Sequence, residues 1–185
     1  MDKNKKSIFS DKENILYQYS VFFKWLIIAV LSGVAIGVVG AVFHEILGLV
    51  TSFRQANSFL ILLLPIGGVV ITWLYKVCGM DKDGGTNSII KGARGEENVS
   101  PKTAPLIMLA TLITHLFGGS AGREGAALQL GGSLISPLRK PLKLSDEDYS
   151  VLIMCGMAAG FSALFGTPIA SAVFAIEVTV VGIVH

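Results

Sequence analysis

The chain has 185 residues, of which 52% are hydrophobic and 15% are charged, and its mean hydropathy is +0.65. Soluble domains carry about 25% charged residues, so this composition excludes an ordinary soluble domain, a disordered chain and a coiled coil. The formal net charge of +2 forms no basic stripe, so we expect no nucleic-acid partner. At roughly 20 apolar residues per helical span, the chain can cross a bilayer several times. We therefore predict an all-α integral membrane protein.

Two long apolar segments follow the N-terminal stretch. The first runs from residue 21 to 53 and places three glycines, Gly33, Gly37 and Gly40, on one predicted helix face. Small residues on one face let a neighbouring helix approach closely. The second segment runs from residue 59 to 79. We expect a packed, tilted span and then a second span.

Cations mark the side of the membrane on which the loops lie. Residues 1–20 contain four lysines, and the polar segment 80–102 contains four further cations. The positive-inside tendency places both in the cytoplasm. Two crossings separate them, so the short loop 51–57, which carries Arg54, is expected outside. We predict a cytoplasmic N-terminal segment, 1–20, followed by a membrane domain, 21–185.

Two half-length helices are predicted in the middle of the chain. The apolar segment 103–117 is short for a span, and it stops at a run with four glycines in eight residues, 118–125. A second short helix is expected over about 126–138, before a basic linker, 138–143, that contains prolines. The chain is thus predicted to enter the membrane, break, and continue as a separate half-helix.

The remainder is predicted to form two more helices. Ser145 is followed by three acids, which is typical of a helix N-cap and first turn. The apolar segments 151–165 and 168–184 are separated by a Gly-Thr-Pro break at 166–168. We expect one helix on each side of this break.

Charge interrupts an apolar segment at Arg123 and Glu124. Ionisable residues at membrane depth normally line a water-filled pathway or a proton relay. The glycines of 118–125 leave backbone amides bare at the positive end of a helix, which suits an anion. Segment 84–88 repeats this pattern before a short helix expected over about 88–93. Two inward-directed half-helix N-termini are the arrangement found around anionic substrates in transporters.

The same residues could also have a purely structural role. Arg123 and Glu124 could form an interfacial ion pair in a surface turn. Residues 84–87 could be an ordinary loop and helix cap. Glu177 is a carboxylate within the last apolar segment, where it needs a partner or water.

The pattern Gly-x-Ser-x-Gly around Ser120 also matches the nucleophile elbow of serine hydrolases. That elbow requires a preceding strand and a later histidine, and the only later histidine is the terminal His185. An intramembrane serine hydrolase, with Ser120 paired to a histidine of a neighbouring helix, is a remote alternative. We otherwise expect no enzyme activity.

Three motifs together resemble the CLC family of chloride channels and anion/proton exchangers. The run GSAGREG at 119–125 is similar to the family's glycine-arginine-glutamate-glycine motif. GGTNSI at 84–89 stands in the place of its serine-bearing glycine motif. Residues 166–177 resemble its later pore-side helix. The match covers nearly the whole chain, and it implies the first inverted-topology repeat of the CLC fold, with broken and half-length helices whose N-termini point to an anion site.

Departures from the chloride pattern resemble the fluoride/proton antiporter branch. Thr86 replaces the usual serine, Asn87 follows it, and Ala126 replaces the usual proline. Val178 stands where chloride/proton exchangers carry an internal proton-transfer glutamate, after the position that matches Glu177. The resemblance therefore implies fluoride export by fluoride/proton antiport, with a chloride channel or chloride/proton exchanger as the alternative.

The resemblance also implies roles for individual residues. Glu124 would be the gating carboxylate, which occupies an anion site when ionised and admits the anion when protonated. Glu177 would not touch the anion but would contact residues that bind it. No metal or other cofactor is expected. The residues expected to bind the anion are Gly85, Thr86, Asn87, Gly122, Arg123, Gly125 and Ala126.

Family members contain two inverted repeats, and this sequence resembles about the first of them, so the second half is expected to be absent here. The missing half or a second copy of the chain would complete the pore, and the full-length form is expected to be a homodimer. The expected partners are fluoride or chloride, protons and the lipid bilayer. The expected location is the bacterial inner (plasma) membrane, crossed several times, with a cytoplasmic N-terminus.

Overall fold

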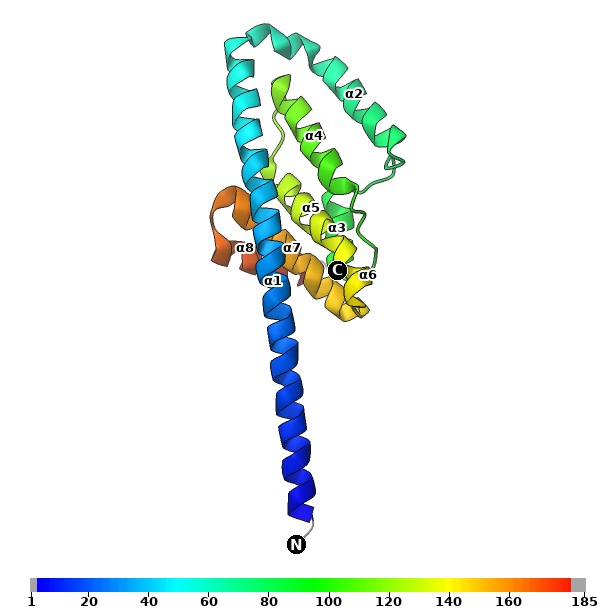
Figure 1. The fold of residues 1–185 in the computed structure, drawn as a ribbon. Coiled ribbons are helices and arrows are strands. Elements are labelled where there is room, and N and C mark those ends of the chain that lie inside the picture. The colour runs from blue at the N-terminus through cyan, green and yellow to red at the C-terminus, as the bar shows by residue number, and fades with distance from the viewer. Residues whose placement is uncertain (1–2, 181–185) are drawn as a thin grey trace.

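The computed structural model describes the backbone of residues 3–180 and the side chains of residues 18–180. Every regular element in this part of the chain is a helix, so the predicted all-α class is confirmed (Figure 1). The elements, in chain order, are α1 (Lys3–Ala56), η1 (Ser58–Leu63), α2 (Leu64–Val77), α3 (Thr86–Ala93), α4 (Thr103–Leu116), α5 (Arg123–Ile135), η2 (Ser136–Leu138), α6 (Arg139–Leu142), α7 (Asp146–Phe165) and α8 (Pro168–Val180).

Membrane-length helices and half-length helices both occur. Among the described residues, three segments are long and apolar enough to cross a bilayer: Gln18–Ala56, Ser58–Val77 and Asp146–Phe165. Large apolar side chains are exposed on the outside of the bundle, including Leu62 at 78% and Ile169 at 82%. Such surfaces are costly in water and favourable against lipid tails. The chain is therefore a membrane protein. The apolar helix α4 is shorter, as expected for a half-length helix, and the described part of α8 is also shorter.

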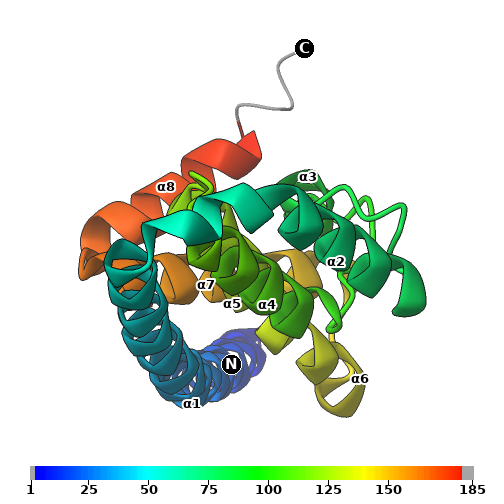
Figure 2. The ribbon, with the colours of Figure 1, turned by 90° about the horizontal axis from the view of Figure 1, so that it is seen from above.

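The helices pack around α5 and α7. Helix α1 is a long rod along one side of the bundle, and α2 returns from its far end (Figure 1). From above, α4 and α5 lie in the middle, with α1, α2, α3 and α8 around them (Figure 2). A cluster of buried apolar side chains that includes Ile89, Leu128, Leu152 and Ile153 joins α3, α5 and α7. This core holds the half-helices α3 and α5 against the spanning helix α7.

Glycines allow α5 and α7 to touch through their backbones. A Cβ atom placed on Gly131 would lie 1.9 Å from the Gly156 carbonyl oxygen. A Cβ on Gly160 would lie 2.3 Å from the carbonyl oxygen of Ala127. No side chain fits at these distances, because carbon and oxygen would overlap. The two helices thus use the close glycine contact that is common in membranes, and it fixes the position of α5.

Helix α1 differs from its prediction in two respects. It continues to Ala56, so residues 51–56 are helical and the chain turns at Asn57 instead of forming a loop over 51–57. Of its three aligned glycines, only Gly40 meets a neighbour, with the Cβ of Ala163 at 2.7 Å from its own Cβ position. The Cβ positions of Gly33 and Gly37 have nothing within 4 Å. The contact is confined to Gly40 because α1 meets α7 closely there but not along the whole glycine face.

The half-helices begin earlier than the sequence predicted. Helix α3 begins at Thr86 instead of residue 88, and α5 begins at Arg123 instead of residue 126. The glycine before each helix makes the change in chain direction: Gly85 has φ +60°, and Gly122 is extended. Thr86, Arg123 and Glu124 are consequently first-turn helical residues. The expected linker 138–143 also contains a short helix, α6.

The predicted features at the ends of α7 are confirmed. The Ser145 hydroxyl accepts a hydrogen bond from the Asp148 amide at 3.1 Å, as expected for an N-cap. Gly166 ends the helix in the left-handed conformation with φ +68°, and α8 begins at Pro168. The last part of the segment predicted over 168–184 lies outside the described residues.

Candidate functional site

The first turns of α3 and α5 are in direct contact. The side-chain amide of Gln129 donates a hydrogen bond from Nε2 to Thr86 Oγ1 at 3.1 Å. A Cβ atom on Gly125 would lie only 2.8 Å from the same hydroxyl oxygen. Gly125 therefore lets the α3 N-terminus reach the α5 N-terminus. The two predicted motifs, distant in sequence, meet in one place.

Both helices begin without a side-chain cap. Their N-cap residues are Gly85 and Gly122, and neither forms a side-chain cap hydrogen bond within the described part of the chain. By contrast, Ser145 caps α7. The first amides of a helix lack intrahelical acceptors and carry the positive end of its dipole. Two adjacent uncapped N-termini are suited to an anionic partner.

Protein groups already occupy part of the loop before α3. The Gly85 amide donates to Asp83 Oδ1 at 3.2 Å, and the Gly84 amide donates to Ser88 Oγ at 3.1 Å. The Asn87 amide donates to the Gly84 carbonyl at 3.2 Å. Asp83 is itself held by the Thr103 hydroxyl at 3.3 Å. In this conformation the loop uses these amides to hold its own shape.

In the described part of the chain, the Thr86 hydroxyl accepts a hydrogen bond but donates none. Its oxygen accepts from Gln129, which is 6% exposed, and its own proton has no acceptor among the described residues. A hydroxyl can accept one hydrogen bond and donate another. Thr86 is half-buried and Asn87 is exposed, so the hydroxyl lies at the edge of the packed core. The hydroxyl proton is therefore available for a further hydrogen bond beside the N-termini of α3 and α5.

Glu124 lies over the start of its own helix. Its carboxylate oxygen Oε2 is 2.6 Å from the position that a Cβ on Gly122 would occupy, and the side chain is exposed. A negative charge is favourable at this end of a helix. Arg123 is half-buried, and the only ion pair in the described part of the chain joins Arg139 to Asp146. The alternative of an ion pair between Arg123 and Glu124 is thus not observed.

Arg54 packs against the turn that precedes this site. Its Nε lies 2.7 Å from the Cβ position of Gly118, which has φ +76°. The Nε atom is buried and forms no hydrogen bond among the described residues. A side chain at Gly118 is therefore disfavoured by both the backbone conformation and the guanidinium. The contact ties the end of α1 to the chain just before Glu124.

Other residues selected from the sequence lie apart from this contact. Ala126 is 4% exposed and belongs to the packed interior of α5. Glu177 is exposed on α8 and forms no ion pair in the described part of the chain. Ser120 is exposed in the non-helical segment before α5. No group of three metal-ligating side chains of the His, Cys, Asp or Glu type occurs among the described residues.

Three residues at the site were missed in the sequence. Gln129 lies four positions after Gly125, hence on the same helix face, and it is a polar residue in an apolar half-helix. That spacing was a usable signal. Asp83 directly precedes the glycine pair, where an acid is common in turns. Arg54 is distant in sequence from residue 118, and no local pattern indicates that the two meet.

Residues 67–184 match the family model for the voltage gated chloride channel. These residues are more than half of the chain. The chain belongs to the voltage gated chloride channel family. This membership confirms the resemblance to the CLC family and overturns the hydrolase alternative, because the family consists of channels and transporters.

Relatives within the CLC family support the same placement. The chain is 38% identical over 160 residues to the chloride/fluoride channel protein of Pseudomonas syringae pv. tomato. The aligned region covers 86% of this chain and 35% of that protein. It is 27% identical over 167 residues to the H(+)/Cl(-) exchange transporter ClcA of Salmonella arizonae. That aligned region covers 82% of this chain and 35% of the relative.

A solved structure in the CLC family has the same fold in the matched region. The crystal structure of a CLC-type fluoride/proton antiporter superimposes with a TM-score of 0.79 at 42% identity, covering 84% of this chain and 40% of that chain. The chain thus spans about a third to two fifths of the length of these relatives. Its fold is that of part of a CLC protein.

Proposed function

We propose that this chain forms part of a membrane pathway that exports fluoride in exchange for protons. The observation that carries the proposal is the contact between the uncapped N-termini of α3 and α5. At this contact the Thr86 hydroxyl has a free proton, and Glu124 lies at the start of α5. Helix N-termini and a hydroxyl donor stabilise an anion that has lost water.

Glu124 serves as the gate in this proposal. The ionised carboxylate and a halide compete for the same positive helix end, since both are anions that favour it. Protonation removes the carboxylate charge and leaves the helix end to the halide. Proton binding and anion binding are then linked, and such coupling is reciprocal. Gly122 permits this position of the carboxylate because it has no side chain.

Fluoride is favoured as the anion for two reasons. Fluoride is strongly hydrated, so a selective site must replace lost water with hydrogen-bond donors. The Thr86 hydroxyl, held by Gln129, is such a donor. In addition, the chain is 42% identical to a structure described as a fluoride/proton antiporter and 38% identical to a chloride/fluoride channel protein.

The remaining parts of the pathway are also proposals. We infer that the described helices form the first inverted repeat, and that further residues, either the rest of a relative-length chain or a second copy, complete the anion site. We place residues 1–20 in the cytoplasm and residues 21–185 in the membrane domain. In a complete protein we expect a homodimer in the bacterial inner membrane.

A liposome flux assay tests the proposal. Vesicles loaded with equal fluoride and chloride are reconstituted with the chain, and selective electrodes follow fluoride, chloride and protons. A second preparation uses a chimera in which this chain replaces the matching part of the Pseudomonas syringae relative, which supplies the remaining length. We expect fluoride release with little chloride release, accompanied by proton movement in the opposite direction.

The variant Glu124→Gln is measured beside Glu147→Gln. Both acids are the second residue of their helices, α5 and α7, so the control makes the same chemical change in a matched position. Glu124→Gln is expected to abolish proton movement because a side-chain amide, unlike a carboxylate, does not take up and release a proton at the pH of a liposome assay. Proton movement that survives in Glu124→Gln contradicts the gate. Chloride release equal to fluoride release contradicts the fluoride assignment.

A further inference from the structure

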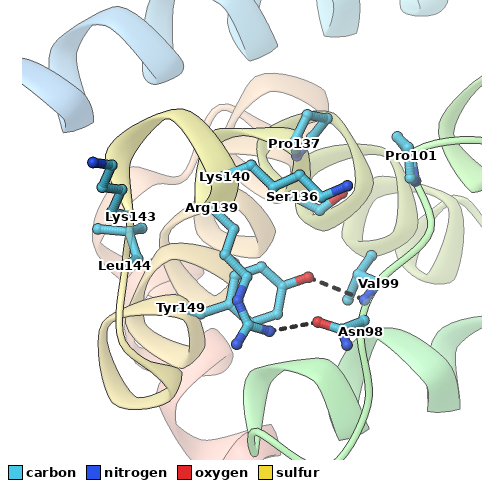
Figure 3. Close-up of a pocket in the computed structure, with 10 residues that line it drawn as sticks. All are labelled: Asn98, Val99, Pro101, Ser136, Pro137, Arg139, Lys140, Lys143, Leu144 and Tyr149. Atoms are coloured by element: carbon cyan, nitrogen blue, oxygen red, sulfur yellow. Dashed lines mark hydrogen bonds between the residues drawn. The ribbon is translucent and has the colours of Figure 1, made fainter.

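A basic pocket lies away from the anion site, where η2 (Ser136–Leu138), α6 and the start of α7 meet. It has a volume of about 700 Å³ and lies between the segment 98–101 and the turn that contains α6 (Figure 3). Three of its lining residues are cations, Arg139, Lys140 and Lys143, and none is an acid. The pocket therefore has the charge of a site for an anion larger than a halide.

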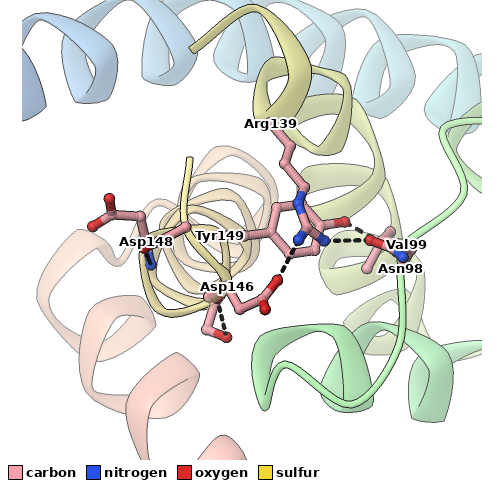
Figure 4. Close-up of polar contacts among 8 residues, drawn as sticks. Asn98, Val99, Arg139, Asp146, Asp148 and Tyr149 are labelled. Atoms are coloured by element: carbon pink, nitrogen blue, oxygen red, sulfur yellow. Dashed lines mark hydrogen bonds and ion pairs between the residues drawn. The ribbon is translucent and has the colours of Figure 1, made fainter. Parts of the chain in front are cut away.

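Arg139 is held in place by its neighbours. It donates hydrogen bonds to Asn98 and Asp146, and its guanidinium lies 4.5 Å from the centre of the Tyr149 ring (Figure 4). Lys140 and Lys143 form no ion pair in the described part of the chain, and both are exposed. Arg139 is thus part of the wall of the pocket, and the two lysines are the charges available to a ligand.

The backbone at Lys143 is strained. Its φ is +48°, and it is the only non-glycine residue with a positive φ among the described residues. Lysine is unusual in this left-handed conformation, which glycine adopts without strain. Such strain persists where the surrounding structure fixes it, and it is found most often at functional sites. Lys143 is the C-cap of α6, and this conformation places it in the lining of the basic pocket.

An apolar groove includes the residue that leads into the same turn. It has a volume of about 280 Å³ between α1 and α5, and its lining residues are Leu31, Ser32, Ala35, Ile36, Val39, Leu134, Ile135 and Leu138. The one hydroxyl in the lining, that of Ser32, donates to the Ile28 carbonyl of its own helix at 2.6 Å. The groove therefore offers an apolar surface on the outside of a membrane bundle. It ends at Leu138, the residue before Arg139.

We propose that this place binds an anionic phospholipid, with its phosphate at Lys140 and Lys143 and an acyl chain in the groove between α1 and α5. The charge of the pocket and the apolarity of the groove match the two ends of one lipid molecule. A basic pocket between membrane helices is a site where acidic headgroups bind. The lipid would add to the contacts that α1 already makes with α5 and Leu138. The assignment is independent of the transported ion.

Native mass spectrometry of the delipidated chain in neutral detergent tests the site. Phosphatidylglycerol and phosphatidylcholine with identical acyl chains are added in separate titrations, and glycerol 3-phosphate is added as a free-phosphate competitor. We expect phosphatidylglycerol to bind more tightly than phosphatidylcholine, and glycerol 3-phosphate to compete poorly because it lacks the chains. The bound fraction should fall when salt is raised, since the lysines are exposed.

The variant Lys140→Gln/Lys143→Gly distinguishes binding from folding. Each lysine near an anionic lipid contributes roughly a fivefold change in affinity, so the double variant should bind phosphatidylglycerol roughly 25-fold more weakly. Glycine at 143 relieves backbone strain, so the unfolding temperature should stay the same or rise. The control Lys76→Gln/Lys91→Gln removes equal charge elsewhere and should bind normally.

Several outcomes would overturn the assignment. Equal binding of the two lipids would show that the lysines do not select the headgroup. Equal affinity of the double variant and the control would place the lipid elsewhere. Full competition by glycerol 3-phosphate would assign the pocket to free phosphate, and a dimer that binds no lipid would assign the groove to a second copy.

Discussion

Three residues control the distance between the two helix N-termini of the candidate anion site. Thr86 provides the hydroxyl, Gln129 holds it at 3.1 Å, and Gly125 leaves the space into which it projects. Because the contact is this close, the donor of α3 lies beside the start of α5. An anion there can be reached by both helices, and small changes at these residues should affect transport more than folding.

Gly125→Ala should impair transport. The added Cβ would lie 2.8 Å from Thr86 Oγ1, so the α3 and α5 N-termini would separate. Either this separation or a turn of the Thr86 side chain away from Gln129 would move the hydroxyl donor, and one hydrogen bond contributes roughly 0.5–1.5 kcal/mol. We therefore expect a several-fold slower fluoride release in the liposome assay. Gly68→Ala is the matched control, because its Cβ position has nothing within 4 Å; an equal loss in both variants contradicts the prediction.

Thr86→Ser should change the ratio of fluoride to chloride release. Serine keeps a hydroxyl for Gln129 but loses the methyl group that restricts rotation about χ1, so the direction of the donor is less fixed. A small anion depends more on a fixed donor than a large one does. We expect the ratio to fall, as measured with the two selective electrodes. An unchanged ratio would show that Thr86 does not determine the selectivity.

Helix α7 positions the half-helices α3 and α5. Gly131 of α5 and Gly156 and Gly160 of α7 bring the two backbones together, and buried side chains of α3 pack against the same helix. The site therefore depends on a spanning helix that contributes none of the residues expected to bind the anion.

Gly160→Ala should destabilise this arrangement. Its Cβ would lie 2.3 Å from the backbone oxygen of Ala127, and a backbone atom cannot turn away as a side chain can. We expect a loss of about 1–3 kcal/mol in the free energy of unfolding, measured by denaturant titration in mixed micelles. Gly48→Ala on α1 is the control, since its Cβ position is open. Equal stability of the two variants would contradict the close contact.

The membrane determines which side chains are exposed on the outside of the bundle. Helix α1, η1 together with α2, and α7 provide the described segments that are long enough to span a bilayer, and the polar residues of the site lie where half-length helices meet. An irregular backbone at membrane depth is tolerated only where protein or water satisfies its polar groups. The segments before α3 and α5 form some hydrogen bonds of their own, such as those of the Gly85 and Gly119 amides, and in our proposal the ion pathway hydrates their remaining polar groups.

The proposed orientation can be tested by cysteine labelling. In a background where Cys78 and Cys155 are replaced by alanine, Asn57→Cys should react with an impermeant maleimide added to intact bacteria. Lys140→Cys should react only after the cells are permeabilised, because the basic turn is expected on the cytoplasmic side. Reaction of both positions from the same side would contradict the topology.

The membrane class, the positions of most helices and the family could be predicted from the sequence, because hydropathy and the glycine motifs are local patterns. It also indicated Thr86, Gly125 and Glu124 as one group of residues, although their roles as anion ligands and gate remain predictions. It misplaced the starts of α3 and α5, since a glycine N-cap turns the chain without any capping side chain to mark it.

The contacts between distant residues could not be predicted from the sequence and are seen in the folded chain. The contact of Gln129 with Thr86 and that of Arg54 with Gly118 join segments that are far apart in the chain. The sequence predicted that Gly33, Gly37 and Gly40 lie on one face of α1, yet only Gly40 contacts α7. Such contacts depend on where helices cross, and crossings are set by packing between whole elements, which a local pattern does not contain.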